Sequence, residues 1–196
     1  DFYGVPGWKL AQYLGFSGEF KQFEKALASY QDAAFPPEFL EILIYLRDGY
    51  KDKINFDKIK IIKILGTGSV NIAIEYLDLA DNEIKVLNIP RQNIENQTRN
   101  DFKRFKKFLD ELLLLPGSEK YQFLAGLLNT IEKSVNLEFD RASVLRRQNE
   151  AVEIYNGKSK DWKIRTVKAF GIIDDIILLE KAYGLGATKA VNSNQT

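Results

Sequence analysis

The chain has 196 residues, with 28 Lys and Arg against 27 Asp and Glu, and its formal net charge is +1. Hydrophobic residues make up 45%, which is typical of one globular domain, and the near-neutral balance argues against nucleic-acid binding through bulk charge. Cys and His are absent, which excludes disulfides, thiolate nucleophiles, cysteine-based metal sites and a histidine general base. Met is absent as well, so we expect the chain to be processed or part of a longer one.

The first 56 residues predict three helices. A short helix is expected over 6–14, and a second begins at Ser17 and carries apolar residues at steps of three and four. A third begins at the two prolines of 36–37, which the first turn of a helix tolerates, and ends at Gly49. Its apolar positions predict a buried side made of Phe39, Ile42, Leu43 and Leu46.

The hydrophobic period then changes to the alternation of β-strands. Residues 58–65, 70–74 and 83–87 alternate and are rich in β-branched side chains. Turns are predicted at 66–69, which contain two glycines, and at 80–82. The pattern predicts an antiparallel meander whose first strand presents Ile59, Ile61 and Lys63 on one face.

Helices are predicted again in the next part of the chain, and a hairpin follows them. The amide-rich residues 91–100 are expected to form a loop before helices at about 102–116, 118–135 and 137–155. The hairpin consists of strands 162–170 and 176–181 with a turn at Asp174-Asp175, and a loose tail begins at Gly184. The predicted fold class is therefore α+β, with a small antiparallel sheet and helices on one side of it.

Four short motifs occur in an order that is informative about function. Gly66-Thr67-Gly68-Ser69 lies between two predicted strands, where glycines allow consecutive backbone N–H groups to face a phosphate. Lys85 lies on the third strand, Glu138-Phe139-Asp140 lies on a helix, and Glu180 and Tyr183 end the last strand. A glycine loop, a strand lysine, an acidic helix and two more strands with a hinge follow the plan of a protein-kinase small lobe.

Each motif has a simpler explanation when it is taken alone. The glycines fit an ordinary hairpin turn, and a lysine on a strand commonly faces solvent. The acidic residues fit the start of a helix, which favours negative charge, and Tyr183-Gly184 fits a strand end. The order and spacing of the four motifs are what favour the kinase-like interpretation.

Over residues 4–184 the chain resembles the UbiB/ABC1/ADCK (AarF) family of atypical, protein-kinase-like proteins. Lys9-Leu10-Ala11-Gln12 resembles the family's N-terminal Lys-x-Gly-Gln motif, and a Gln-Asp and proline-containing stretch follows at a similar distance. The remaining correspondences are the phosphate loop at 66–70, the strand lysine Lys85 with the later Pro90, the Glu-x-Asp motif at 138–140 and the hinge at 180–184.

The resemblance implies an N-terminal helical extension at 1–56, a kinase-like small lobe at 57–184 and a tail at 185–196. It implies that the phosphates of ATP or ADP are bound by Gly66, Thr67, Gly68 and Ser69 and neutralised by Lys85. It also implies that the base is contacted near Glu180 and Tyr183 and that the cleft is lined by Lys9, Gln12, Glu138 and Asp140. Finally, it implies protein partners in a larger assembly and contact with mitochondrial, plastid or bacterial membranes.

The chain also departs from the family pattern. Ala11 replaces the motif glycine, and Val144 stands where the family has the helix glutamate that pairs with the strand lysine. Glu138 and Glu150 are alternative partners, but neither has the family's spacing. Asp-Phe-Gly does not occur and His-Arg-Asp cannot, so neither ligands for magnesium nor a catalytic base are recognisable. We therefore expect no phosphoryl transfer by these residues alone.

Three functions stay open on this evidence. The first is the small lobe of an atypical kinase or ATPase, and the second is a non-catalytic, pseudokinase-like subunit of a larger complex. The third is an unrelated α+β binding module. The basic cluster at 103–107, which is interrupted by phenylalanines, fits either the solvated face of a core helix or a surface for a membrane or partner, and the first is favoured.

Overall fold

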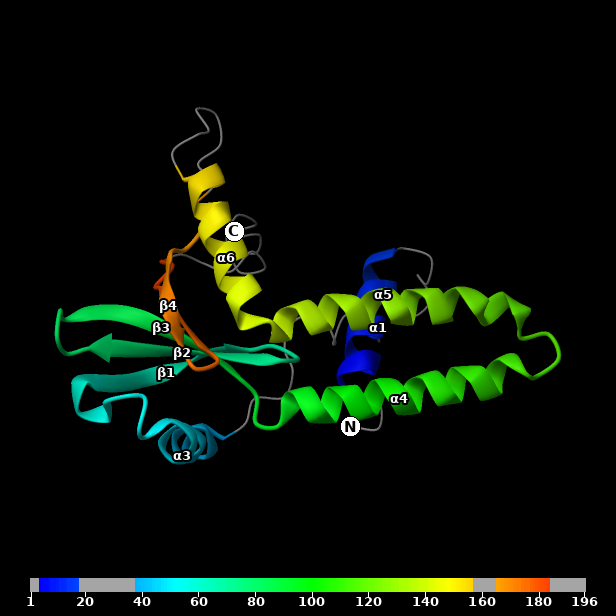
Figure 1. Cartoon of the computed structure of the whole chain (residues 1–196), viewed down its shortest axis with the longest axis horizontal. Coiled ribbons are helices and arrows are strands. Elements are labelled where there is room, and N and C mark those ends of the chain that lie inside the picture. Colours follow the sequence, from blue (N-terminus) through cyan, green and yellow to red (C-terminus); the bar gives the residue numbers. More distant parts are fainter. Residues whose placement is uncertain (1–3, 18–37, 157–164, 184–196) are drawn as a thin grey trace, which may run out of the picture.

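The computed structural model describes residues 4–17, 38–156 and 165–183, and these form an α+β fold with one antiparallel sheet. The five strands have the spatial order β1-β2-β3-β5-β4. Figure 1 shows the sheet at one end of the molecule, with α3 on one side of it and the α4–α5 hairpin extending away. The predicted α+β class and the five-stranded antiparallel sheet are confirmed. The expectation that helices lie on one side of the sheet is wrong, because α3 covers one face and α6 contacts the other. The second predicted helix and the tail lie outside the described residues.

The elements follow one another in the order that the hydrophobic pattern predicts. The helices are α1 (Gly4–Ser17), α3 (Phe39–Tyr50), α4 (Ile94–Leu113), α5 (Gln122–Phe139) and α6 (Arg141–Tyr155), with 3-10 turns at Phe56–Lys58 and Glu119–Tyr121. The strands are β1 (Ile59–Thr67), β2 (Asn71–Asp78), β3 (Glu83–Pro90), β4 (Ala169–Ile173) and β5 (Ile176–Glu180).

The first three strands form the predicted meander. β1 pairs with β2 and β2 with β3, both antiparallel, and Asn82 takes the left-handed conformation that the tight turn between β2 and β3 requires. The register of β1 shifts between Ile61 and Lys63, which is the mark of a β-bulge. Because of this bulge, Ile64 rather than the predicted Lys63 packs against the core with Ile59 and Ile61.

The last two strands form a hairpin that joins the sheet through β5. β5 pairs with β3 on one side and with β4 on the other, and the tight turn between β4 and β5 has Asp174 at a φ of 58°. Helices α4, α5 and α6 make the connection from β3 to β4. As a result, the strand that is last in sequence lies inside the sheet and not at its edge.

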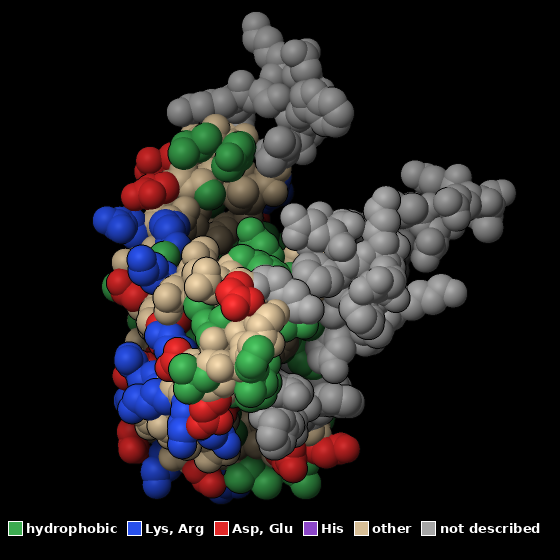
Figure 2. Space-filling view, turned by 90° about the vertical axis from the view of Figure 1, so that its right-hand side faces the viewer, with side chains coloured by type: hydrophobic (Ala, Val, Ile, Leu, Met, Phe, Trp, Pro, Cys, Tyr) green, Lys and Arg blue, Asp and Glu red, His purple; other side chains and the backbone are tan. Residues whose placement is uncertain are grey.

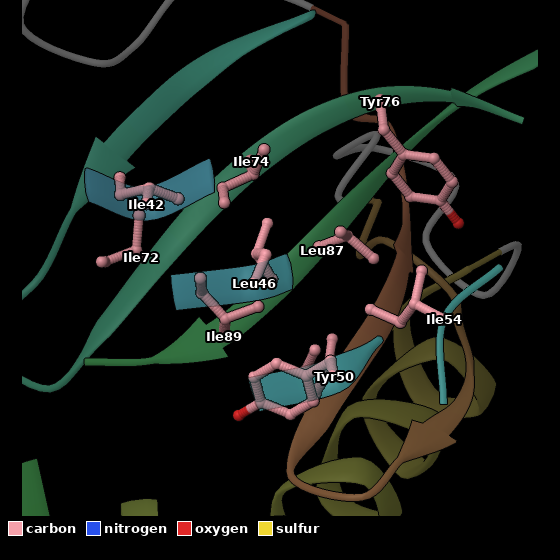
Figure 3. Packing of buried hydrophobic residues seen from close by; sticks show 10 residues of the cluster. Ile42, Leu46, Tyr50, Ile54, Ile72, Ile74, Tyr76, Leu87 and Ile89 are labelled. Carbon is pink, nitrogen blue, oxygen red and sulfur yellow. The ribbon is translucent and has the colours of Figure 1, made fainter. Parts of the chain in front are cut away.

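The larger hydrophobic core lies between α3 and one face of the sheet. Figure 3 shows Ile42, Leu46 and Tyr50 of α3 directed at the isoleucines and Leu87 of β2 and β3. These helix positions are four residues apart, so they form one apolar stripe. The prediction that Phe39 is buried is wrong: it stands at the first position of α3 and is 40% exposed.

A second core joins α1 to the α4–α5 hairpin. Its buried residues come from all three helices and from the β1–β2 loop, and they are Val5, Val70, Ile94, Phe102, Leu109, Leu128, Ile131 and Val135. Helix α1 lies across α4 and α5, as Figure 1 shows. The described parts of the predicted N-terminal extension are thus divided between the two cores: α1 packs onto the hairpin and α3 onto the sheet.

Several predicted boundaries differ from the structure. The strand predicted at 162–170 is wrong in its described part, since β4 begins at Ala169 and the backbone of Thr166 and Val167 instead hydrogen-bonds to Asn156 and Gln148. Residues 94–100 are not a loop but the first two turns of α4, which begins after Asn93 in a left-handed conformation. Amide-rich sequence is a poor helix signal, and here burial of Ile94 and Thr98 against neighbouring elements outweighs it. Helix α5 runs to Phe139, and Asp140 then separates it from α6.

Candidate functional site

The two faces of the sheet differ in chemistry. Directly paired residues of an antiparallel sheet share a face, and successive residues alternate between faces. One face is apolar and is covered by α3. The opposite face, here called the α6 face, is contacted by α6 and consists of Asn71, Ala73, Glu75, Val86, Asn88, Ile177 and Leu179.

The glycine loop lies where β1 passes into β2. Gly66 and Thr67 end β1, and the Thr67 side chain is buried. The N–H of Gly68 donates a 2.7 Å hydrogen bond to the carbonyl of Asn71, which closes the turn. That donor is therefore used by the loop itself, and Ser69 instead lines a cavity against α1 and α4.

The structure does not bring Lys85 to the glycine loop. Lys85 pairs with Tyr76, which is buried on the α3 side, whereas Thr67 pairs with Ile72 at the other end of β2. The four-residue separation along β2 corresponds to about 13 Å. The ammonium group of Lys85 instead bonds to Asp78, at 2.8 Å, and to Asp81, so it fastens the β2–β3 turn.

Because Lys85 donates hydrogen bonds to them, the pKa values of the Asp78 and Asp81 carboxyl groups lie below their usual value of 3.8. A carboxyl whose pKa is lower in the folded state stabilises the fold above the unfolded pKa, and this stabilisation is lost as the pH falls through the folded pKa. As the pH is lowered from about 5 to 2.5, we expect the free energy of unfolding of Lys85→Met to fall less steeply than that of the unmodified chain. Urea denaturation over this pH range measures the effect.

Lys107→Met is the matched control, because the Lys107 side chain is 80% exposed. It should leave the pH profile of stability as in the unmodified chain. Equal slopes for the unmodified chain and Lys85→Met would contradict the role assigned to Lys85.

Lys9 and Glu138, in contrast, are brought together. The Lys9 ammonium lies 2.9 Å from a carboxylate oxygen of Glu138, and this ion pair joins α1 to the end of α5. Gln12 lies almost one turn further along α1 and is half-buried. Asp140 has a separate role: it caps α6 by accepting hydrogen bonds from the N–H and the hydroxyl of Ser143, and these bonds lower its pKa.

The two residues for which the resemblance implies a hinge lie at or just after the end of β5. The Glu180 carboxylate accepts hydrogen bonds from Arg165 and from the backbone N–H of Lys168, so it secures the start of β4. Tyr183 is 80% exposed. Lys85 and Glu180 are direct partners in the β3–β5 ladder, so these two predicted residues are brought together. The predicted site residues are therefore distributed over three places: the glycine loop, the junction of α1 with the end of α5, and one end of the β3–β5 pair.

Arg141 is the most connected polar side chain near the α6 face, and the sequence analysis did not single it out. Its guanidinium donates to the carbonyl of Asp175 at 2.7 Å, to Oδ1 of Asn71 at 3.1 Å and to both the carbonyl and Oδ1 of Asn88. The residue is only 9% exposed, and burial lowers the pKa of its guanidinium. Arg141 thus ties α6 to β2, β3 and the β4–β5 turn.

The sheet-facing row of α6 contains no acid. Arg141 and Gln148 both contact the sheet region, and the half-buried Val144 lies between them at helical spacing. Neither alternative glutamate faces the sheet lysine, because Glu138 pairs with Lys9 and Glu150 is exposed beside Arg146 at 3.8 Å. A pair between Lys85 and α6 is therefore not formed.

A further ion pair lies on the α6 face itself. The Lys181 ammonium contacts the buried Glu75 carboxylate at 2.6 Å, and both side chains are largely shielded from solvent. Glu75 pairs with Val86 across the sheet. Glu75 and Lys181 therefore neutralise each other's charge on this part of the sheet.

The basic cluster of α4 proves to be mainly a solvated face. Lys103, Arg104 and Lys107 are exposed, whereas Phe102 is buried and Lys106 pairs with Glu132 of α5 at 2.5 Å. Figure 2 looks onto the end of the α4–α5 hairpin, where hydrophobic side chains lie at the surface among charged ones. The exposed apolar residues of this end are Leu114, Leu115, Tyr121 and Phe123.

Two kinds of feature are absent from the part of the chain that the structure describes. Within 4–17, 38–156 and 165–183, no helix has the length and hydropathy of a membrane span, and no group of three or more acidic residues is placed to hold a metal ion. Comparison of the chain with family models, with curated proteins and with solved structures finds no match.

Proposed function

We propose that this chain is a non-catalytic, kinase-like small lobe that serves as an interaction subunit of a larger assembly. The order of its elements supports the kinase-like part: a glycine loop between two strands, a third strand, helices, and then two strands that end in a hinge. The packing of α1 onto the α4–α5 hairpin and the Lys9–Glu138 pair support the likeness to the UbiB/ABC1/ADCK family.

The observation that carries the non-catalytic part is the identity of the residues on the α6 face of β3. Kinases place a lysine there, which binds the phosphates and pairs with a glutamate of the following helix. Here β3 presents Val86 and Asn88 on this face, and α6 presents Val144. Lys85 faces the other side and is held by two aspartates.

The cations that do lie near the α6 face already have partners. Arg141 is bound by Asn71, Asn88 and the carbonyl of Asp175, and Lys181 is bound by Glu75. To bind a nucleoside triphosphate on this face, Arg141 or Lys181 would have to release its present partners. The carboxylate on this face, that of Glu75, is already paired with Lys181 and so is not available to hold a metal ion. An interaction role, in contrast, is supported by the exposed apolar side chains at the end of the α4–α5 hairpin.

Thermal unfolding in the presence of ATP or ADP, with and without magnesium, tests this proposal. A ligand at one hundred times its dissociation constant stabilises a fold by about 2.7 kcal/mol, which corresponds to a rise of roughly 5–10 °C for a domain of this size. We expect no saturable, magnesium-dependent rise in Tm at millimolar nucleotide.

Arg104→Gln is titrated in parallel, because Arg104 lies on α4 and lines a separate cavity in which phosphate groups could also bind. A saturable rise that needs both adenine and magnesium, and that persists in Arg104→Gln, would contradict the proposal. Inorganic tripolyphosphate at equal ionic strength separates nucleotide binding from a general effect of charge.

A further inference from the structure

A cavity of about 400 Å3 lies between α1, the first half of α4 and the β1–β2 loop, away from the α6 face. Its walls are fixed by close packing: Gly4 of α1 has a φ of +51°, and a Cβ atom there would lie 1.8 Å from Oδ2 of Asp101 on α4. A side chain at Gly4 would displace the Asp101 carboxylate, and the positive φ would strain any residue other than glycine. The volume is within the range of small-molecule sites in proteins.

Positive charge exceeds negative charge in this cavity. Arg91 and Arg104 both line it, against the single carboxylate of Asp101, which pairs with Arg104. Arg91 is half-buried, and its loss of hydration lowers the pKa of its guanidinium. Arg91 donates a hydrogen bond to the carbonyl of Gly68 at 3.4 Å, and two guanidinium groups beside one cavity are the charged donors that an anion favours.

The rest of the lining suits a ligand that carries hydroxyl groups and a ring. Ser69, Gln97 and Asn100 supply one hydroxyl and two amides, which both donate and accept hydrogen bonds. Trp8 supplies an aromatic surface, and the apolar face of a sugar ring packs well against such a surface.

We propose that this cavity binds a small sugar phosphate, with the phosphate between Arg91 and Arg104 and the hydroxyl groups on Gln97 and Asn100. Two arginines provide the planar, charge-assisted contacts that phosphate oxygens favour. The site is separate from the α6 face, so it does not depend on the absence of nucleotide binding there.

Trp8 provides a direct readout of occupancy. The chain has two tryptophans, and a Trp162→Phe background leaves Trp8 as the single indole. Glucose 6-phosphate and ribose 5-phosphate, titrated to about 20 mM, should change Trp8 fluorescence saturably, with at least one bound about tenfold more tightly than inorganic phosphate or free glucose. Titration calorimetry on the unmodified chain checks the same dissociation constants.

Arg104→Gln should weaken sugar-phosphate binding about tenfold. Its side chain is 76% exposed, so the substitution is compatible with folding. Arg99→Gln on the same helix is the matched control, because Arg99 pairs with Glu95 and does not line the cavity. Any one of three results would overturn the proposal. These are the absence of a saturable signal with either sugar phosphate, equally tight binding of inorganic phosphate, and an equal loss of sugar-phosphate affinity in Arg104→Gln and Arg99→Gln.

Discussion

Arg141→Ala is expected to lower the free energy of unfolding by about 3–4 kcal/mol, one of the largest effects of any polar substitution in this chain. The substitution removes a buried guanidinium that makes four hydrogen bonds to three different parts of the sheet. It also removes the hydrogen-bond donor from the Oδ1 atoms of Asn71 and Asn88 and from the carbonyl of Asp175, and these three residues are half-buried. Urea denaturation measures the loss, and the melting temperature should fall by roughly 10 °C.

Two variants separate the geometry of Arg141 from its charge. Arg141→Lys keeps the charge but loses the planar fork, so it should recover less than half of the lost stability. Arg146→Ala, one turn further along α6, removes a side chain that is 71% exposed and should change stability by no more than about 0.5 kcal/mol. A loss below about 1 kcal/mol for Arg141→Ala would show that α6 does not depend on this residue.

Phe102→Ala is expected to destabilise the fold by about 3–5 kcal/mol. Phe102 is 2% exposed and lies in the core that joins α1, α4 and α5. Its removal leaves a cavity between three helices, each of which is held in place by the others. Because α1 contributes Val5 to this core, we also expect faster proteolysis within α1 in the variant.

Phe108→Ala provides a control with the same chemistry on the same helix. Phe108 is 51% exposed, so its truncation should cost less than about 1 kcal/mol. Chemical denaturation of the two variants side by side measures the difference. Equal losses would mean that the α1–α4–α5 core does not stabilise the described fold as a unit.

The parts of the fold that were predicted well are those with a strong period. The alternation of β1, β2 and β3 and the stripe of α3 were found because burial on one face requires them. The amide-rich start of α4 was missed, since its helical state depends on burying Ile94 and Thr98 against distant residues. No local pattern carries that information.

The interpretation of Lys85 shows why a motif alone does not define a site. The string Ile84-Lys85-Val86 resembles a kinase motif, but successive side chains of a strand point to opposite faces of the sheet, and the motif does not say which face each one takes. Lys85 lies on the same face of β3 as Leu87 and Ile89, which are buried against α3. Val86 therefore lies on the α6 face instead. A sequence signal for this was available, because the alternation of Leu87 and Ile89 already marks the core face.

Arg141 was missed for a different reason. A buried arginine has the same sequence appearance as an exposed one, and it follows the Glu138-Phe139-Asp140 motif without any distinguishing spacing. The indirect signal was in its partners. Asn71 and Asn88 lie on the same face of β2 and β3 and are partly buried, and partly buried amide groups need hydrogen-bonding partners.

The position of β5 inside the sheet has a consequence for how the chain acquires its structure. Its Leu178 pairs with Leu87 of β3, more than ninety residues earlier, so the sheet is completed only when almost the whole described chain is present. Contacts of such long sequence separation slow folding, because a long loop must close before they form. Until β5 arrives, the hydrogen-bonding groups of β3 form an open edge to which a strand of another molecule can pair. A growing chain that has not yet reached Ile176 is therefore the stage at which this protein is most exposed to aggregation.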